Sequence, residues 1–340
     1  MEFRLDKSGD HRVRSAGKCV ASSLILALCT GTIGAQDFSC PRRTVPIALR
    51  DKENLPIENV SVADIEAKVR GKPVKMLSLA PDLRPHRVVV IVDASGSMGS
   101  TAAEPPLFAL EFALAWHFFE VNRQTSQIAL LVFNSHVTEV VDFAQGNSAV
   151  GDKLQQISSD HSYAKNVKGK TALRDTILAG LQLLRHPTSA DALYVLTDGG
   201  DNASERNSAD VTQRLAASSV RLFGVLLRQE VGYRNRPPDE SDPDELSEMA
   251  SKSGGEILTA AAWHGKQMAL SADSEAKLKS QETLARLYQT ILGNKLLEIE
   301  LPFPIAKNER WELRLSDGAR RRWIGTHITY PTTLMKCNSE

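Results

Sequence analysis

Two aspartates and several hydroxyl side chains follow apolar runs at distant places in the chain. Residues 88–92 are all β-branched, and Asp93, Ser95 and Ser97 come directly after them. A second apolar run, at residues 192–196, is followed by Thr197 and Asp198. Carboxylate and hydroxyl oxygens are hard donors that suit Mg²⁺, Mn²⁺ or Ca²⁺. The residue types therefore predict a binding site that depends on a divalent cation.

These side chains can meet at one place if the apolar runs are strands of one sheet. Short apolar runs rich in Val and Ile are typical of buried strands, and ligands of open α/β sheets bind beyond the carboxyl ends of the strands. Thr171, just before an apolar helical stretch, adds a hydroxyl from a third loop. We therefore expect three loops to converge on one cation. The alternative is that Asp93 and Ser95 only cap the next helix, and the agreement of three loops weighs against it.

The three loops resemble the metal-ion-dependent adhesion site (MIDAS) of the von Willebrand factor type A (VWA) domain family. The resemblance covers roughly residues 85–294, and it assigns the family's metal ligands to Asp93, Ser95, Ser97, Thr171 and Asp198. It implies that the two serines bind the cation directly and that the threonine binds directly or through water. The aspartates are then expected to act largely through water and by orienting the hydroxyls. The resemblance also implies an open coordination position for a carboxylate of a partner protein.

Patterns for other chemistry are weak in this sequence. Residues 169–171 resemble the end of a phosphate-binding loop, but Ala164 stands where that motif needs glycine. Ser95 does not lie in the Gly-x-Ser-x-Gly pattern of hydrolases. No His-Glu-x-x-His pattern occurs, and His117 lies within an apolar helical stretch where it is expected to pack. We therefore expect no catalytic residues and a protein that is not an enzyme.

The N-terminal 35 residues have the pattern of a secretory signal peptide. The polar segment 1–18 has a small excess of basic residues, the apolar segment 19–34 follows it, and Ile33-Gly34-Ala35 offers a cleavage site. The apolar segment is short and interrupted by Ser, Thr and Gly, which favours cleavage over a membrane anchor. We expect a secreted, periplasmic or cell-envelope protein with no membrane span after cleavage.

Two cysteines remain after removal of the signal peptide, Cys40 and Cys337, one near each end of the chain. In an oxidising compartment this arrangement predicts a disulfide that joins the two ends. The alternative is a pair of free thiols in terminal tails.

The charges of the chain are balanced, with 41 basic and 41 acidic residues. Residues 1–35 hold five basic and three acidic groups, so the remaining chain has a net charge of −2. This balance gives no reason to expect nucleic acid or an anionic membrane as a partner.

The pattern of elements predicts a doubly wound, mostly parallel α/β domain at residues 85–294. Its expected strands are 87–92, 127–133, 192–197 and 220–227, with an antiparallel edge strand at 137–143, and its expected helices are 106–121, 172–185, 207–217, 243–253 and 275–293. Residues 44–50, 62–79 and 295–301, within the segments 36–84 and 295–340, alternate like strands. Each of these two β segments is too small to fold alone, so we expect them to pair into one small β domain.

Local signals add detail to the β segments and the loops. We expect a turn at residues 71–73, and a hairpin whose turn is Asp317-Gly318. Residues 228–244 have the composition of a long surface loop. The run Arg320–Arg322 offers a partner patch or, as we favour, a solvated hairpin edge that discourages aggregation.

The layout of the whole chain is also similar to that of a VWA-related family of acidobacteria. The similarity rests on the signal peptide, on Arg70-Gly71-Lys72-Pro73, and on Tyr330-Pro331 shortly before Cys337.

The leading hypothesis is an exported, adhesion-type module that recognises an acidic residue of a partner protein through a divalent cation. Mg²⁺ is the favoured cation, with Mn²⁺ and Ca²⁺ as alternatives. A second hypothesis is a structural or envelope-assembly component in which the metal only makes the loop edge rigid. A hydrolase that uses the metal to activate water is disfavoured, because no general base is evident beside the ligand loops.

Overall fold

The computed structural model describes residues 41–52, 55–99, 107–160, 167–229, 243–262 and 284–336. The expected signal peptide, both cysteines of the expected disulfide and most of the expected surface loop at 228–244 lie outside these ranges. The first part of the helix expected at 275–293 also lies outside them, and residues 284–292 of it are helical. Within the described ranges, no helix has the length and apolar character needed to cross a membrane.

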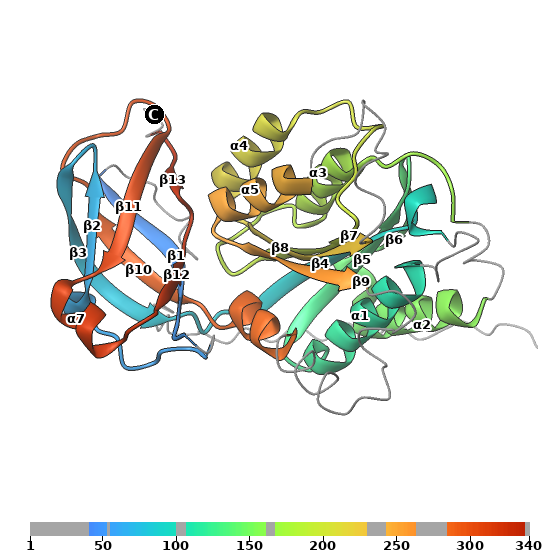
Figure 1. Ribbon diagram of the computed structural model, residues 1–340, viewed down its shortest axis with the longest axis horizontal. Coiled ribbons are helices and arrows are strands. Elements are labelled where there is room, and N and C mark those ends of the chain that lie inside the picture. The colour runs from blue at the N-terminus through green and yellow to red at the C-terminus, as the bar shows by residue number, and fades with distance from the viewer. Residues whose placement is uncertain are drawn as a thin grey trace, which may run out of the picture. The chain divides into compact units, whose positions relative to one another are not determined.

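A six-stranded sheet forms the centre of the α/β domain, in the order β6-β5-β4-β7-β8-β9 (Figure 1). The strands are β4 (His86–Asp93), β5 (Ser126–Phe133), β6 (Val137–Val141), β7 (Ala192–Thr197), β8 (Arg221–Gln229) and β9 (Glu256–Ala262). All neighbouring pairs run parallel except β5 and β6, which run antiparallel. The edge strand β6 therefore makes the sheet mixed.

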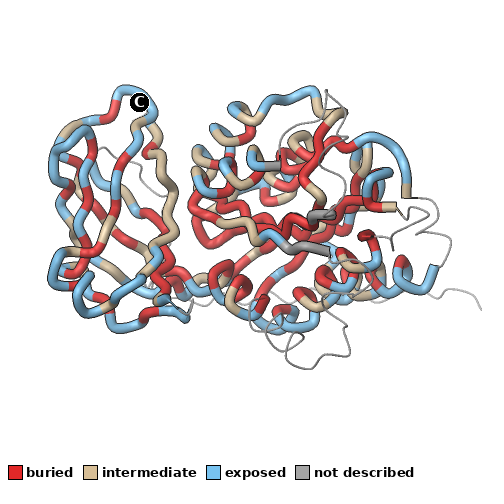
Figure 2. The backbone as a smooth tube through the Cα atoms, in the orientation of Figure 1, coloured by how far each residue is buried: buried red, intermediate tan, exposed pale blue. Residues whose placement is uncertain are grey.

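Helices cover both faces of this sheet. One apolar cluster contains side chains of α1 (Leu107–Asn122), α2 (Gly146–Ser159) and the helix at 284–292, and the other contains side chains of α3 (Leu173–Leu183), α4 (Ser208–Ser218) and α5 (Pro243–Ser253). Successive strand residues point to opposite faces, so Val90 joins the first cluster and Val89 the second. Figure 2 shows the central strands buried along their length. Burial of both faces explains why these strands are continuous apolar runs.

A seven-stranded antiparallel sheet forms the β domain, in the order β12-β1-β10-β3-β2-β11-β13. The strands are β1 (Arg42–Arg50), β2 (Ile65–Val69), β3 (Lys72–Pro81), β10 (Lys295–Glu300), β11 (Glu309–Leu315), β12 (His327–Thr329) and β13 (Thr333–Leu334). Strand β10 lies between β1 and β3, and β11 pairs with β2. Strands from before and after the α/β domain are thus interleaved in one sheet around a single apolar cluster.

Two local turns differ from the prediction. The turn between β2 and β3 falls at Arg70 and Gly71, whose φ angles are 50° and 74°, and β3 already begins at Lys72. Asp317-Gly318 does not form a hairpin turn but begins the short helix α7 (Asp317–Arg322). The Ser316 hydroxyl caps this helix by accepting a backbone hydrogen bond. A serine followed by an aspartate is a strong helix start, and here it prevails over the Asp-Gly turn signal.

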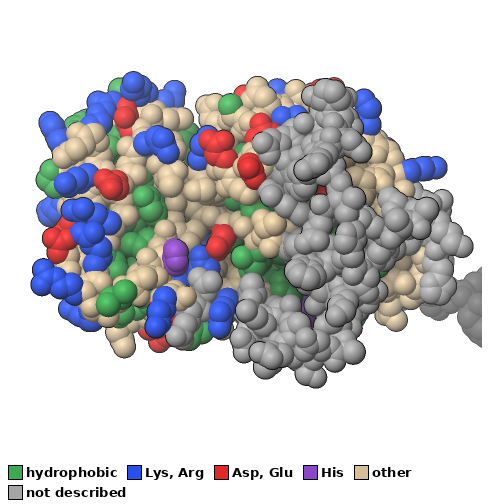
Figure 3. Space-filling view, viewed as in Figure 1, with side chains coloured by type: hydrophobic (Ala, Val, Ile, Leu, Met, Phe, Trp, Pro, Cys, Tyr) green, Lys and Arg blue, Asp and Glu red, His purple; other side chains and the backbone are tan. Residues whose placement is uncertain are grey.

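The arginines of α7 are partly neutralised by neighbouring acids. Arg320 forms an ion pair with Asp317, and Arg322 lies 3.5 Å from a carboxylate oxygen of Asp64. The Arg322 guanidinium also lies over the ring of Trp323, 4.8 Å from its centroid. On the face of this domain that Figure 3 shows, Lys and Arg predominate, and a few Asp and Glu side chains lie among them. This pairing favours a solvated surface run over a partner patch.

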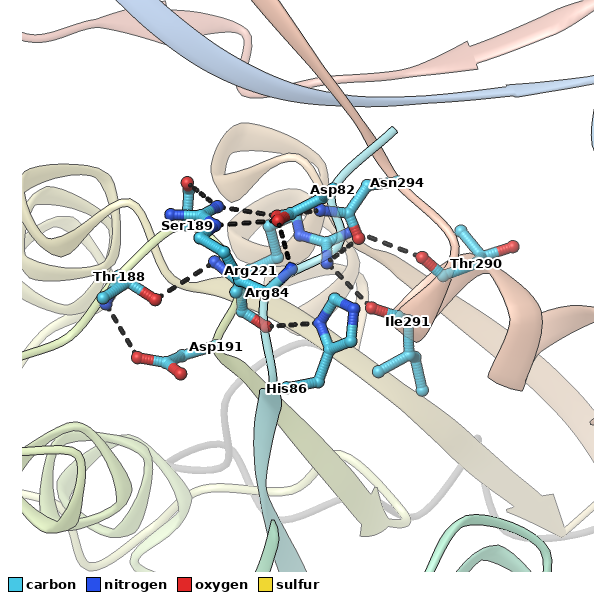
Figure 4. Close-up of polar contacts among 11 residues, drawn as sticks. Asp82, Arg84, His86, Thr188, Ser189, Asp191, Arg221, Thr290, Ile291 and Asn294 are labelled. Atoms are coloured by element: carbon cyan, nitrogen blue, oxygen red, sulfur yellow. Dashed lines mark hydrogen bonds and ion pairs between the residues drawn. The ribbon is translucent and has the colours of Figure 1, made fainter. Parts of the chain in front are cut away.

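A buried polar network holds together the two connections between the domains (Figure 4). Arg221, at the start of β8, is 1% exposed and donates to the carbonyl oxygens of Thr290 (3.2 Å) and Ile291 (2.8 Å). It also donates to the side-chain oxygen of Asn294 at 2.8 Å. The Asn294 amide donates to the carboxylate of Asp82 at 3.1 Å, and the Asp82 backbone N–H donates to the Asn294 carbonyl at 3.0 Å. Arg221 thereby binds carbonyls at the C-terminal end of a helix, where a cation is favourable.

Arg84 extends the network at the first connection, where the chain passes from the β domain into the α/β domain. Its Nε and Nη2 atoms donate to the two carboxylate oxygens of Asp82 at 2.7 and 2.6 Å, and Nη2 also donates to the Ser189 hydroxyl at 2.7 Å. Burial opposes ionisation of Asp82, but the hydrogen bonds from Arg84 outweigh it and lower the pKa of this carboxyl. Burial lowers the pKa of Arg221 to about 10, so Arg221 stays charged at neutral pH.

Candidate metal centre

The buried carboxylate of Asp93 lies at the centre of the candidate site. Asp93 ends strand β4, and its side chain is fully buried. The backbone N–H of Ser95 donates to Asp93 Oδ1 at 2.8 Å, and the Thr197 hydroxyl donates to Oδ2 at 2.6 Å. Thr197 ends the neighbouring parallel strand β7, so the sheet register brings the two residues together. Both oxygens of Asp93 are therefore held in place.

Two serine hydroxyls follow Asp93, that of Ser95 just before a short 3₁₀ turn (Gly96–Met98) and that of Ser97 within it. The Ser95 side chain is buried and that of Ser97 is exposed, and their hydroxyl oxygens lie 3.1 Å apart. Met98 is completely buried in the apolar cluster under α1, which anchors the turn. The loop thus presents two neighbouring hydroxyl oxygens at the carboxyl edge of the sheet.

The loop that carries Thr171 is bonded to this serine loop. The backbone N–H of Gly96 donates to the Gly169 carbonyl at 3.0 Å, and Gly169 has a φ of +100°, which favours glycine. Thr171 is 3% exposed, and its backbone N–H donates to the side-chain oxygen of Asn202 at 2.9 Å. The Asn202 N–H donates back to the Thr171 carbonyl at 3.0 Å. These bonds join the second loop to the loop that follows β7.

Asp198 supplies the second carboxylate of the site. It follows Thr197, is only partly buried, and accepts a hydrogen bond from the Gly200 N–H at 3.2 Å. Burial, together with the negative charge of Asp198, raises the pKa of Asp93 to about 7. Two carboxylates that repel each other in this way are an environment that favours a bound cation.

The donor set fits a hard divalent cation. Its expected members are Asp93, Ser95, Ser97, Thr171 and Asp198, which are all oxygen donors. Within the described ranges, no cluster of three or more His, Cys, Asp and Glu side chains is placed to hold a metal. A site built on two carboxylates must therefore depend on the hydroxyls as well. The hydrogen bonds described above bring the three loops together. The side chains of the five expected donors would then orient and hold the ion.

Residues that were not predicted also shape this edge. Thr197 orients Asp93, and Asn202 joins two loops. Arg174, in the first turn of α3, donates its backbone N–H and its Nε to the buried Asp201 carboxylate at 2.8 and 3.1 Å. The sequence holds one signal for the role of Thr197, because this polar residue ends an otherwise apolar strand. The role of Asp201 depends on tertiary contacts.

Comparison with known families agrees with this geometry. Residues 88–270, more than half of the chain, match the family model of the von Willebrand factor type A domain. The chain therefore belongs to the von Willebrand factor type A domain family. Domains of this family generally mediate protein–protein interactions, and they commonly bind a divalent metal at a MIDAS. No curated protein matches the chain in sequence.

Several solved structures are similar to parts of the chain. BatB from Bacteroides thetaiotaomicron is 15% identical over 59% of this chain and 98% of its own, with a TM-score of 0.39. The SpRpn10 VWA domain is 11% identical over 59% of this chain and 97% of its own, with a TM-score of 0.40. The human COPII-coat protein Sec24c is 10% identical over 75% of this chain and 44% of its own, with a TM-score of 0.41. The family assignment rests on the sequence match.

Proposed function

We propose that this protein is an exported binding module that recognises an acidic residue of a partner protein through a divalent cation, with Mg²⁺ as the favoured ion. The observation that carries the proposal is the set of hydrogen bonds that joins the three polar loops at the carboxyl edge of the sheet, beside the buried Asp93 carboxylate. The negative charge of Asp198 adds to the effect of burial on the pKa of Asp93. A divalent cation would neutralise both carboxylates.

The same edge of the domain supports an acidic partner. Lys168 and Lys170 are exposed on the loop that carries Thr171, and they flank the candidate site. Cationic side chains beside a binding site attract and orient an anionic partner. A bound cation supplies an electron-poor coordination position, and the two lysines add long-range attraction for a carboxylate.

The direct test is calorimetric titration of the mature protein with Mg²⁺ and with Mn²⁺. We expect Asp93→Ala to abolish binding and Ser97→Ala to weaken it. Ser135→Ala is the matched control, because Ser135 is another exposed serine at this edge of the sheet. Equal binding by the wild-type protein and Asp93→Ala would contradict the cation site.

The second test is capture of partners from an envelope extract in Mg²⁺ and in EDTA. We expect a partner that is retained only with the metal and with intact Thr171, and that is lost with Thr171→Ala. A partner retained regardless of metal would favour the second candidate, in which the ion only makes the loop edge rigid. In that case metal removal lowers the melting temperature and leaves capture unchanged.

We propose that the protein is not an enzyme. Turnover of an ester, phosphoester or peptide substrate that disappears in Asp198→Ala would contradict this. We also propose cleavage of a signal peptide after residue 35, location outside the cytoplasm, and the doubly wound classification of the α/β domain. The proposed division is 36–84 and 295–340 for the β domain and 85–294 for the VWA domain, in the layout of the acidobacterial VWA-related family.

A further inference from the structure

Helix α1 carries a buried carboxyl group that the proposed ligand set does not use. Glu111 is fully buried, and neither of its side-chain oxygens has a hydrogen-bond partner among the described residues. Buried polar atoms are almost always hydrogen-bonded, because leaving them without a partner destabilises the fold. An apolar residue would fill this position without that cost. The carboxyl group therefore needs an explanation other than packing.

The geometry of α1 places Glu111 above the carboxyl edge of the sheet. Glu111 and Phe118 are seven residues apart, so they lie on the same face of the helix. The Phe118 ring stacks on Tyr194 of β7, with centroids 4.7 Å apart. Seven helical residues span about 10.5 Å, and the three residues from Tyr194 to Thr197 span about 10 Å of strand. Since α1 runs opposite to the parallel strands it connects, Glu111 comes at about the level of the carboxyl end of β7.

The electrostatic environment of Glu111 agrees with this placement. Burial raises the pKa of Glu111 well above its usual value, and the negative charges of Asp93 and Asp198 add to the effect. Burial also raises the pKa of Tyr194 well above its usual value, and the neighbouring Tyr288 and then Glu111 add to this effect. Glu111 is thus within electrostatic reach of both carboxylates of the candidate metal centre.

We propose that Glu111 is an outer carboxylate of the cation centre, which is ionised once a divalent ion is bound, then places a third negative charge behind Asp93 and Asp198, and raises the affinity for the ion. This inference rests on the proposed function. Glu111 does not join the direct ligands, in agreement with the lack of a three-carboxylate cluster within the described ranges. Groups behind the direct ligands commonly change metal affinity by about 10-fold to 100-fold.

The test compares Mn²⁺ affinity among variants of the full mature chain by calorimetric titration. Glu111→Gln keeps the shape and removes the charge, whereas Glu111→Asp keeps the charge and shortens the side chain. Glu120→Gln is the matched control, because Glu120 is an exposed glutamate on the same helix. We expect a loss of about tenfold in Glu111→Gln, a smaller loss in Glu111→Asp and wild-type affinity in Glu120→Gln. Melting in EDTA checks that all variants fold.

The pattern of affinities separates a charge effect from a packing effect. A packing role predicts the opposite order, with Glu111→Asp weaker than Glu111→Gln, and that order would overturn the inference. Wild-type affinity in Glu111→Gln would overturn it as well, while loss of binding in Asp93→Ala leaves the proposed function intact. Equal binding by the wild-type protein and Asp93→Ala would overturn the proposed function and this inference together.

Discussion

Replacing Asp93 by asparagine should stabilise the metal-free protein and remove its response to metal. Burial and the charge of Asp198 raise the pKa of Asp93 from 3.8 to about 7. At about 1.4 kcal/mol per pKa unit, keeping this carboxylate ionised at pH 8 costs the folded state about 4 kcal/mol. Asparagine carries no charge, and its carbonyl oxygen can still accept the hydrogen bond from the Ser95 N–H. We therefore expect the melting temperature of Asp93→Asn in EDTA to rise by up to about 10 °C.

The pKa shift also predicts how the stability of the metal-free protein changes with pH. Because the raised pKa lets the folded state bind a proton between about pH 4 and pH 7, Asp93 makes the metal-free protein less stable as the pH rises through this window. The difference in melting temperature between Asp93→Asn and the wild-type protein should therefore shrink from pH 8 to pH 5. Melting curves followed by circular dichroism in EDTA at both pH values measure it.

Addition of Mg²⁺ completes the experiment. At one hundred times its dissociation constant, the ion should stabilise the wild-type protein by about 2.7 kcal/mol and leave Asp93→Asn unchanged. A variant that is less stable than the wild-type protein in EDTA at pH 8 would refute the reasoning. So would a difference that grows on acidification.

Three further predictions concern the stability of the fold and the expected disulfide. Arg221→Met leaves buried carbonyl oxygens without a donor, so urea unfolding should show a loss of about 2–4 kcal/mol. Gly255→Ala puts a Cβ atom 1.9 Å from a carbonyl oxygen of β8 and should lower the melting temperature sharply, whereas Gly318→Ala meets nothing within 4 Å and should stabilise α7 by up to about 1 kcal/mol. A peptide digest without reductant should yield a linked pair that contains Cys40 and Cys337, and two free thiols in the exported protein would contradict the disulfide.

The central strands of the α/β domain could be predicted because both of their faces are buried. Two elements of this domain were missed for a physical reason. Helix α2 buries only Val150, Leu154 and Ile157 among its apolar residues, and it contains two glycines, so its helical pattern is weak. Strand β9 contains three consecutive alanines, and alanine is depleted in strands. Pairing with β8 determines its structure.

The β domain shows which part of a fold depends on tertiary contacts. The two β segments alternate in sequence, which indicates strands but not their neighbours. The position of β10 between β1 and β3 depends on long-range pairing, and no local signal encodes it. The start of α7 shows that a capping serine can change the outcome of a turn signal.

The residue types of the candidate site and the meeting of its loops could be predicted from the sequence, but the side chains that surround them could not. Asp93 and Asp198 end or follow apolar strands, which can be seen in the sequence. Thr197 looks like one more strand residue, and Glu111 looks like an exception within an apolar helix. Their relation to Asp93 arises only when the strands pair and α1 packs on the sheet. The ligand set itself remains a prediction that metal titration must test.

The arrangement of the two domains also has a mechanical consequence. Near the ends of the described chain, an Nη atom of Arg43 donates to the carbonyl of Met335 at 3.3 Å. The α/β domain leaves and re-enters the β domain at one place, where Asp82 and Asn294 are hydrogen-bonded. Tension applied at residues 43 and 335 is therefore carried by the seven-stranded sheet and bypasses the α/β domain while that sheet holds. Only a load applied at the carboxyl edge of the α/β sheet would stretch the loops around Asp93.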